Sequence, residues 1–177
     1  KLAVEEMVES RHDRVLFLGY PAELTRRQLN YIPRFNDAAI KAARHHGMPF
    51  EIISPLEPGR EAAREVVARL IPNFHKERLG LIISNSQTVQ PILNALIAHG
   101  IVPGLDVSVI AHCTDEVAQE AEPPITNVSL EPREVSRRAI ETVFRLLDSN
   151  RSAPERIVDL VPSRLTRRST VMPLPKI

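Results

Sequence analysis

The sequence is poor in features that mark several classes of protein. Cys113 is the only cysteine among 177 residues, which excludes an internal disulfide and is consistent with a reducing cytoplasm. No apolar run approaches the roughly 18 residues of a membrane span, and no secretory signal is visible. The 23 basic and 22 acidic residues nearly cancel, whereas nucleic-acid-binding domains usually carry a basic excess. We therefore expect a cytoplasmic chain that contacts neither a membrane nor DNA directly.

Motifs for catalysis, metal binding and phosphate binding are also missing. The chain has no glycine-rich phosphate loop. His45 and His46 are adjacent within a helical pattern, so they do not share a face on which to hold a metal. A cysteine nucleophile needs a base within reach, but His112 precedes Cys113 directly, and successive strand residues point to opposite faces. We expect no enzyme, no metal site and no cofactor.

Helical and extended patterns alternate along the first two thirds of the chain. Four short apolar runs are typical of strands covered on both faces, and the intervening segments repeat apolar residues at helical spacing. Such alternation predicts βαβ units, and hence an α/β fold with a parallel sheet flanked by helices. The expected helices lie near residues 2–11, 28–46, 60–70 and 88–99, and the expected strands at residues 15–18, 50–53, 79–83 and 107–111.

Ligands of such folds bind beyond the carboxyl ends of the strands. The residues expected there are Gly19-Tyr20, Ser54, Ser84-Asn85-Ser86 and His112-Cys113-Thr114.

The last third differs in pattern. Pro123 and Pro124 interrupt the chain before a short strand at residues 125–130. A strongly amphipathic helix follows at residues 133–147, then a polar turn at 148–154. Residues 157–161 and 164–169 indicate two further extended pieces.

Four segments resemble the sensor domain of LacI/GalR transcriptional regulators. Residues 83–86 read ISNS at a strand end, and residues 100–110 read GIVPGLDVSVI after the next helix. The other two segments read PPITNV at residues 123–128 and LTRRST at 165–170. The motifs follow the family's order over nearly the whole chain.

The resemblance implies one lobe of a two-lobed sensor like the periplasmic binding proteins. The DNA-binding helix-turn-helix of the family precedes the sensor, and Lys1 would fall just after the first crossing between lobes. Residues 1–125 would form the C-terminal lobe, 126–150 a strand and helix that cross to the other lobe, and 151–177 the return and tail. The crossing helix would then leave an apolar face uncovered: Val135, Ala139, Ile140, Val143, Phe144, Leu146 and Leu147. We expect it to be disordered, swapped between chains, or packed against residues outside this chain.

The resemblance also implies a small-molecule effector site. Arg34, near the start of a helix, would hold an effector bidentately, and Asn85 would offer an amide, although it could instead only cap the next helix. Cys113 stands where the family usually has aspartate, and Leu130 where it often has glutamine. These two replacements, with Ser86 in place of another aspartate, argue against an ordinary sugar as effector and leave open a sensor without ligand.

A two-fold homodimer is the expected assembly. The resemblance places its interface on the helix after Asn85 and on residues 117–121, although part of that helix could pack on its own sheet. The residues concerned are Val89, Ile92, Leu93, Leu96, Ile97 and Val117.

Effector binding between the lobes would change the spacing of the DNA-binding heads, and so the affinity for operator DNA, through the domain outside this chain. The alternative function is a solute-binding protein of a transport system, which shares this architecture but is exported and monomeric. An enzyme built on an α/β sheet is the remaining rival.

Overall fold

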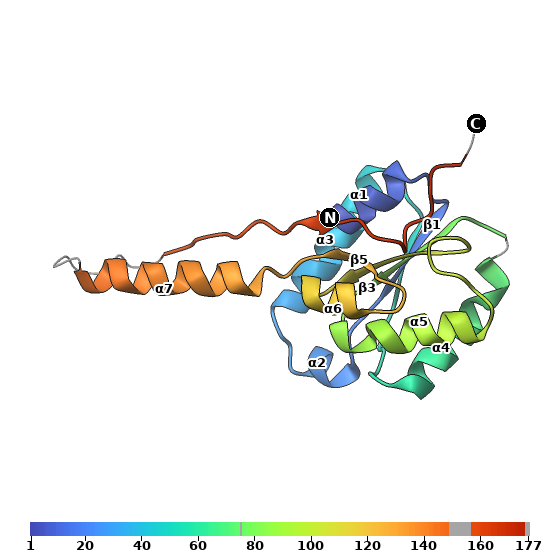
Figure 1. Cartoon of the computed structure of the whole chain (residues 1–177), viewed down its shortest axis with the longest axis horizontal. Coiled ribbons are helices and arrows are strands. Elements are labelled where there is room, and N and C mark those ends of the chain that lie inside the picture. The colour runs from blue at the N-terminus through green and yellow to red at the C-terminus, as the bar shows by residue number, and fades with distance from the viewer. Residues whose placement is uncertain (75, 149–156, 176–177) are drawn as a thin grey trace.

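A computed structural model describes residues 1–74, 76–148 and 157–175 (Figure 1). Helices and strands alternate through most of this part, as the sequence predicts. The helices are α1 (Leu2–Glu9), α2 (Ala22–Arg26), α3 (Tyr31–His45), α4 (Arg60–Phe74), α5 (Val89–Ala98), α6 (Asp115–Glu120) and α7 (Pro132–Asp148), with a 3-10 turn η1 (Ser86–Thr88) before α5. The strands are β1 (Arg14–Leu18), β2 (Phe50–Ile53), β3 (Leu79–Ile83), β4 (Ser108–His112), β5 (Thr126–Val128) and β6 (Leu165–Thr166).

The strands of the described part form one sheet in the order β2-β1-β3-β4-β5-β6. The first five strands are mutually parallel, and β6 pairs antiparallel with β5. The predicted parallel α/β sheet flanked by helices is confirmed. Leu18 aligns with Ile83, and Ile83 with Ala111, so β1, β3 and β4 end at the same edge. The chain passes from β1 outward to β2 and then returns past β1 to β3, which makes the β1–β3 boundary a topological switch point.

Two layers of helices cover the sheet, one on each face (Figure 1). Alternate residues of each strand point to opposite faces, so Leu16 and Leu18 pack with α4 and α5, whereas Val15 and Phe17 pack with α1 and α3. The central strand β3 is buried along its whole length. Removing these side chains from water supplies the main driving force for the fold.

Several element boundaries differ from the predictions. The helix expected at residues 28–46 begins only at Tyr31, after a turn with Gln28 at a φ of 50°, and the short helix α2 before that turn was not expected. The helix expected to end near Leu70 continues to Phe74, although Pro72 removes one backbone donor, and the buried Phe74 ring anchors its last turn. Helix α6 was not expected, and residues 157–161 form no strand. The turn predicted at 148–154 lies almost wholly outside the described residues.

Helix α7 projects from the body of the molecule, and the segment from Ile157 runs beside it back to the sheet (Figure 1). Arg138 of α7 is paired with Asp159 of that segment at 3.1 Å. The apolar side of the helix is uncovered, with Phe144 61% and Leu147 74% exposed. No helix in the described part is both long and apolar enough to cross a membrane.

The C-terminal segment is tied to the sheet beside β4 by hydrogen bonds. The Thr170 hydroxyl, fully buried, donates to the carbonyl of Val109 at 2.6 Å and accepts from the amide of Thr126 at 2.9 Å. The Val109 amide donates in turn to the Thr170 carbonyl at 2.7 Å. This segment therefore joins β4 and β5, which contribute His112 and Val128 to the cavity described next.

Candidate functional site

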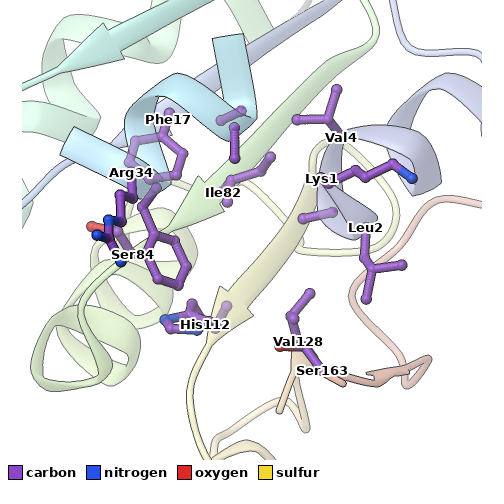
Figure 2. Close-up of a pocket in the computed structure, with 15 residues that line it drawn as sticks. Lys1, Leu2, Val4, Phe17, Arg34, Ile82, Ser84, His112, Val128 and Ser163 are labelled. Carbon is purple, nitrogen blue, oxygen red and sulfur yellow. The ribbon is translucent and has the colours of Figure 1, made fainter. Parts of the chain in front are cut away.

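A cavity of about 280 Å³ lies beside the carboxyl ends of β1, β3 and β4, on the face covered by α1 and α3. Figure 2 shows Arg34, Ser84 and His112 toward one side of it, with Lys1 and the α1 residues Leu2 and Val4 on the other. Its lining is mainly apolar. The lining residues are Lys1, Leu2, Ala3, Val4, Phe17, Arg34, Phe35, Ala38, Ala39, Ile82, Ser84, Ala111, His112, Val128 and Ser163.

Arg34 brings a cation to this cavity from the first turn of α3. The helix begins at Tyr31, and Pro33 suits its first turn because the amides there have no partner within the helix. Among the described residues, no hydrogen bond or ion pair engages the Arg34 guanidinium. The side chain is exposed, and a guanidinium can pair bidentately with a carboxylate.

His112 and Ser84 form the polar wall at the ends of β4 and β3. The Ser84 hydroxyl donates to the Leu18 carbonyl at 2.8 Å and so links β3 to β1. The His112 ring packs on Phe35 with 4.5 Å between ring centroids. Burial lowers the pKa of His112 to about 4, which outweighs the opposing effect of its hydrogen bond with the Ser84 backbone. His112 is therefore neutral near pH 7 and offers a hydrogen bond without a charge.

A second cavity, of about 410 Å³, adjoins the first and shares Phe35, Ser84, His112 and Ser163 with it. Asn85 and Leu130 line it together with Tyr20, Leu24, Tyr31 and Ser86.

Only one of the two polar atoms of the Asn85 side chain in this second cavity has a hydrogen-bond partner. Its Oδ1 accepts from the amide of Gln87 at 3.1 Å and caps η1, whereas its buried Nδ2 has no partner. The two roles considered for Asn85 are therefore compatible, because the cap uses the oxygen and leaves the amide donor for a ligand.

Cys113 does not reach either cavity. It is 0% exposed and belongs to the core between the sheet and α4 and α5. Successive strand residues alternate between faces, so placing His112 in the cavity turns Cys113 away from it. Burial raises the pKa of the Cys113 thiol to about 11, which leaves it protonated. Cys113, predicted as an effector-binding residue, therefore lies in the core, and His112 is the residue of this turn that lines both cavities.

Sequence reasoning also missed the aromatic part of the lining. Phe17 and Phe35 flank the cavity from β1 and α3. A sequence signal existed only for Phe17, which lies in a predicted strand, because residues adjacent on a helix such as Arg34 and Phe35 do not share a face.

Most of the predicted interface residues are part of the chain's own core. Val89, Ile92, Leu93 and Leu96 are at most 1% exposed and pack between α5 and the sheet, so they have no surface to offer a second subunit. Two residues of the same prediction do lie at the surface: Ile97, 49% exposed, and Val117, 36% exposed.

In residues 1–74, 76–148 and 157–175, no three His, Cys, Asp or Glu side chains gather closely enough to hold a metal ion.

Solved structures of transcriptional regulators share the fold at low sequence identity. A LacI family transcriptional regulator from Bifidobacterium animalis subsp. lactis is 19% identical with a TM-score of 0.79, over 98% of this chain and 60% of that chain. A probable maltose operon transcriptional repressor from Staphylococcus aureus is 16% identical with a TM-score of 0.74, over 94% and 56%. A lac repressor dimer bound to operator and the anti-inducer ONPF is 17% identical with a TM-score of 0.75, over 97% and 49%.

The chain thus spans about half to three fifths of each of these proteins. No curated protein matches it. One family model, described as a periplasmic binding protein-like domain, matches residues 4–171. A match over nearly the whole chain shows that it belongs to the periplasmic binding protein-like domain family.

Proposed function

We propose that this chain is the effector-sensing part of a bacterial transcriptional repressor of the LacI/GalR type. The DNA-binding helix-turn-helix would lie in a part of the protein outside these residues. Support comes from the family match and from the fold shared with regulators that are longer than this chain, one of them bound to operator DNA. The nearly balanced charge of this chain agrees with DNA contact elsewhere in the protein.

The cavity at the strand ends is the observation that carries the proposal. Arg34 enters it without an ion-pair partner in the described residues, and the buried Nδ2 of Asn85 lacks an acceptor beside it. Unused donors next to a concave apolar surface are typical of a ligand site. Because the neutral His112 and buried Cys113 provide no nucleophile with an adjacent base, the arrangement suits binding better than catalysis.

Regulation would follow from unequal binding of the effector to two arrangements of the protein. A ligand that fills this cavity shifts the protein toward whichever arrangement binds it better, and only to the extent of that difference in affinity. The coupling is reciprocal, so operator DNA must alter effector affinity by the same factor.

The decisive experiment uses the full-length protein that contains this chain. Fluorescence anisotropy would measure its binding to the DNA upstream of its own gene, with and without a panel of small carboxylates and sugars. We expect binding that falls as salt rises, and at least one compound that changes the affinity. Arg34→Ala should abolish that change, whereas Arg44→Ala, on an exposed part of the same helix, should preserve it. A protein that binds no DNA, or whose response survives Arg34→Ala, contradicts the proposal.

The protein is further proposed to act as a homodimer through the surface that carries Ile97 and Val117. These side chains stay exposed on α5 and α6, whereas their buried neighbours complete the core. Ile97→Glu should lower the dimer fraction in sedimentation velocity, because a charge in an apolar interface lacks compensation. Leu105→Glu, at another exposed apolar residue, tests whether the effect is local. A dimer insensitive to Ile97→Glu would place the interface elsewhere.

A further inference from the structure

We infer that the ligand of the Arg34 cavity is a small monocarboxylate with an apolar body, such as a branched aliphatic or aryl carboxylic acid. This inference rests on the proposed sensing function and names the chemical class of its effector. Charge, polarity and shape of the cavity wall each point to it independently.

The charge of the wall favours one negative group. No aspartate or glutamate lines the Arg34 cavity or the adjoining one. Lys1 is the other lysine or arginine in the lining, and its Nζ is paired with Glu5 at 3.4 Å, whereas the Arg34 guanidinium has no partner among the described residues. A guanidinium holds a carboxylate through two parallel hydrogen bonds. A cationic ligand would find no counter-charge here, and a doubly charged phosphate would exceed what one free arginine can balance.

The wall of the Arg34 cavity itself offers few hydrogen-bond partners to a polyhydroxylated ligand. Apart from Arg34 and Lys1, the polar side chains of the cavity are Ser84, His112 and Ser163, and the Ser84 hydroxyl already donates to Leu18. Each ligand hydroxyl buried without a partner costs about 1–3 kcal/mol. A sugar would bury several such groups against apolar side chains, so the wall selects against it.

The apolar side of the cavity matches a hydrocarbon body of limited size. Phe17, Ile82 and Val128 line it from the sheet, and Leu2 and Val4 line it from α1 (Figure 2). At about 280 Å³ the cavity lies near the lower end of the usual range for small-molecule sites. A carboxylate at Arg34 would leave its hydrocarbon part to displace water from these side chains.

The experiment measures binding of phenylacetate and 4-methylpentanoate to the full-length protein that contains this chain, by isothermal titration. Their neutral amides and glucose serve as matched ligands. We expect both acids to bind at least about tenfold more tightly than their amides, because only the acids form the charge-assisted pair with Arg34. Arg34→Gln should remove that preference, and Arg44→Gln should leave it intact.

Three results would overturn the inference: equal binding of acid and amide, an acid preference that persists in Arg34→Gln, or glucose binding in the absence of acid binding. Each of these leaves the proposed function standing if the full-length protein still binds operator DNA and responds to another ligand. Conversely, a full-length protein without DNA binding ends the proposed function even if the acids bind here as expected. The two failures are therefore distinguishable.

Discussion

At the scale of single residues, one buried hydroxyl joins the C-terminal segment to the sheet. Thr170→Val keeps the shape of the side chain but leaves the amide of Thr126 and the carbonyl of Val109 without their partner. We expect the free energy of unfolding to fall by on the order of 3 kcal/mol, because both groups stay buried. Urea denaturation followed by circular dichroism would measure the loss.

A neighbouring hydroxyl provides the matched control. Ser169 donates to the Pro124 carbonyl at 2.8 Å from an exposed position, where water can take its place. Ser169→Ala should therefore cost less than about 1 kcal/mol. Equal losses in the two variants would show that burial of the Thr170 pair does not govern the stability of this segment.

Single residues also show how far sequence reasoning about the site reaches. Arg34 was predicted from the family resemblance together with its place near a helix start, and Asn85 from its place at a strand end. Each lines one of the two adjoining cavities, and their roles in binding stay predictions. Cys113 was chosen by alignment with a family pattern, although strand periodicity indicated that His112 and Cys113 must face opposite sides. Whether His112 or Cys113 points into the cavity depends on where β4 ends relative to the helices. No local sequence pattern contains that information.

At the scale of elements, the Met7 side chain of α1 fills the space beside Gly80 of β3. A Cβ on Gly80 would lie 2.6 Å from the Met7 Sδ, so this fully buried side chain would have to shift within the core. Gly80→Ala should therefore lower the free energy of unfolding by about 1–3 kcal/mol through overpacking. Thermal and urea denaturation would measure it.

The cause of that loss can be isolated with a second substitution. Met7→Ala alone should cost about 2–5 kcal/mol through the cavity that it leaves. If the methyl group introduced by Gly80→Ala fills part of that cavity, the double variant Met7→Ala, Gly80→Ala loses clearly less than the sum of the single losses. Strict additivity of the two losses would mean that the Met7 side chain is not the group that excludes a methyl at position 80.

Elements were predictable to different degrees, for physical reasons. Strands β1, β2 and β3 are continuous apolar runs that leave little choice of structure, and their predicted positions hold within a residue. Helix α5 was placed correctly, but most of its apolar residues were wrongly assigned to a dimer interface. Helical spacing marks a buried face without saying whether the chain itself or a partner covers it. Helix α6 carries only Ala118 as a buried residue, so its six residues show no helical repeat.

At the scale of the whole molecule, neutral buried histidines make stability depend on pH. Burial lowers the pKa of His112 to about 4, and that of His12 is lowered by burial too. Between the unfolded value of about 6.5 and the folded value, the unfolded chain binds more protons than the folded chain. The contribution of these neutral histidines to the free energy of unfolding is therefore fully present above pH 6.5. It is lost as the pH drops through this window, by up to on the order of 3 kcal/mol for His112 alone.

The corresponding test compares chemical denaturation of the parent chain and His112→Gln at pH 7, 6, 5 and 4. Glutamine keeps a polar group in the cavity wall but does not titrate, so the variant should lose less stability on acidification than the parent chain does. His99→Gln, at an exposed position, should follow the parent profile. Because other groups shared by all three proteins also titrate in acid, the difference between profiles isolates His112. Parallel profiles for the parent chain and His112→Gln would mean that the fold does not hold this ring neutral. The cavity wall would then gain a positive charge at His112 in mild acid, in addition to those of Arg34 and Lys1.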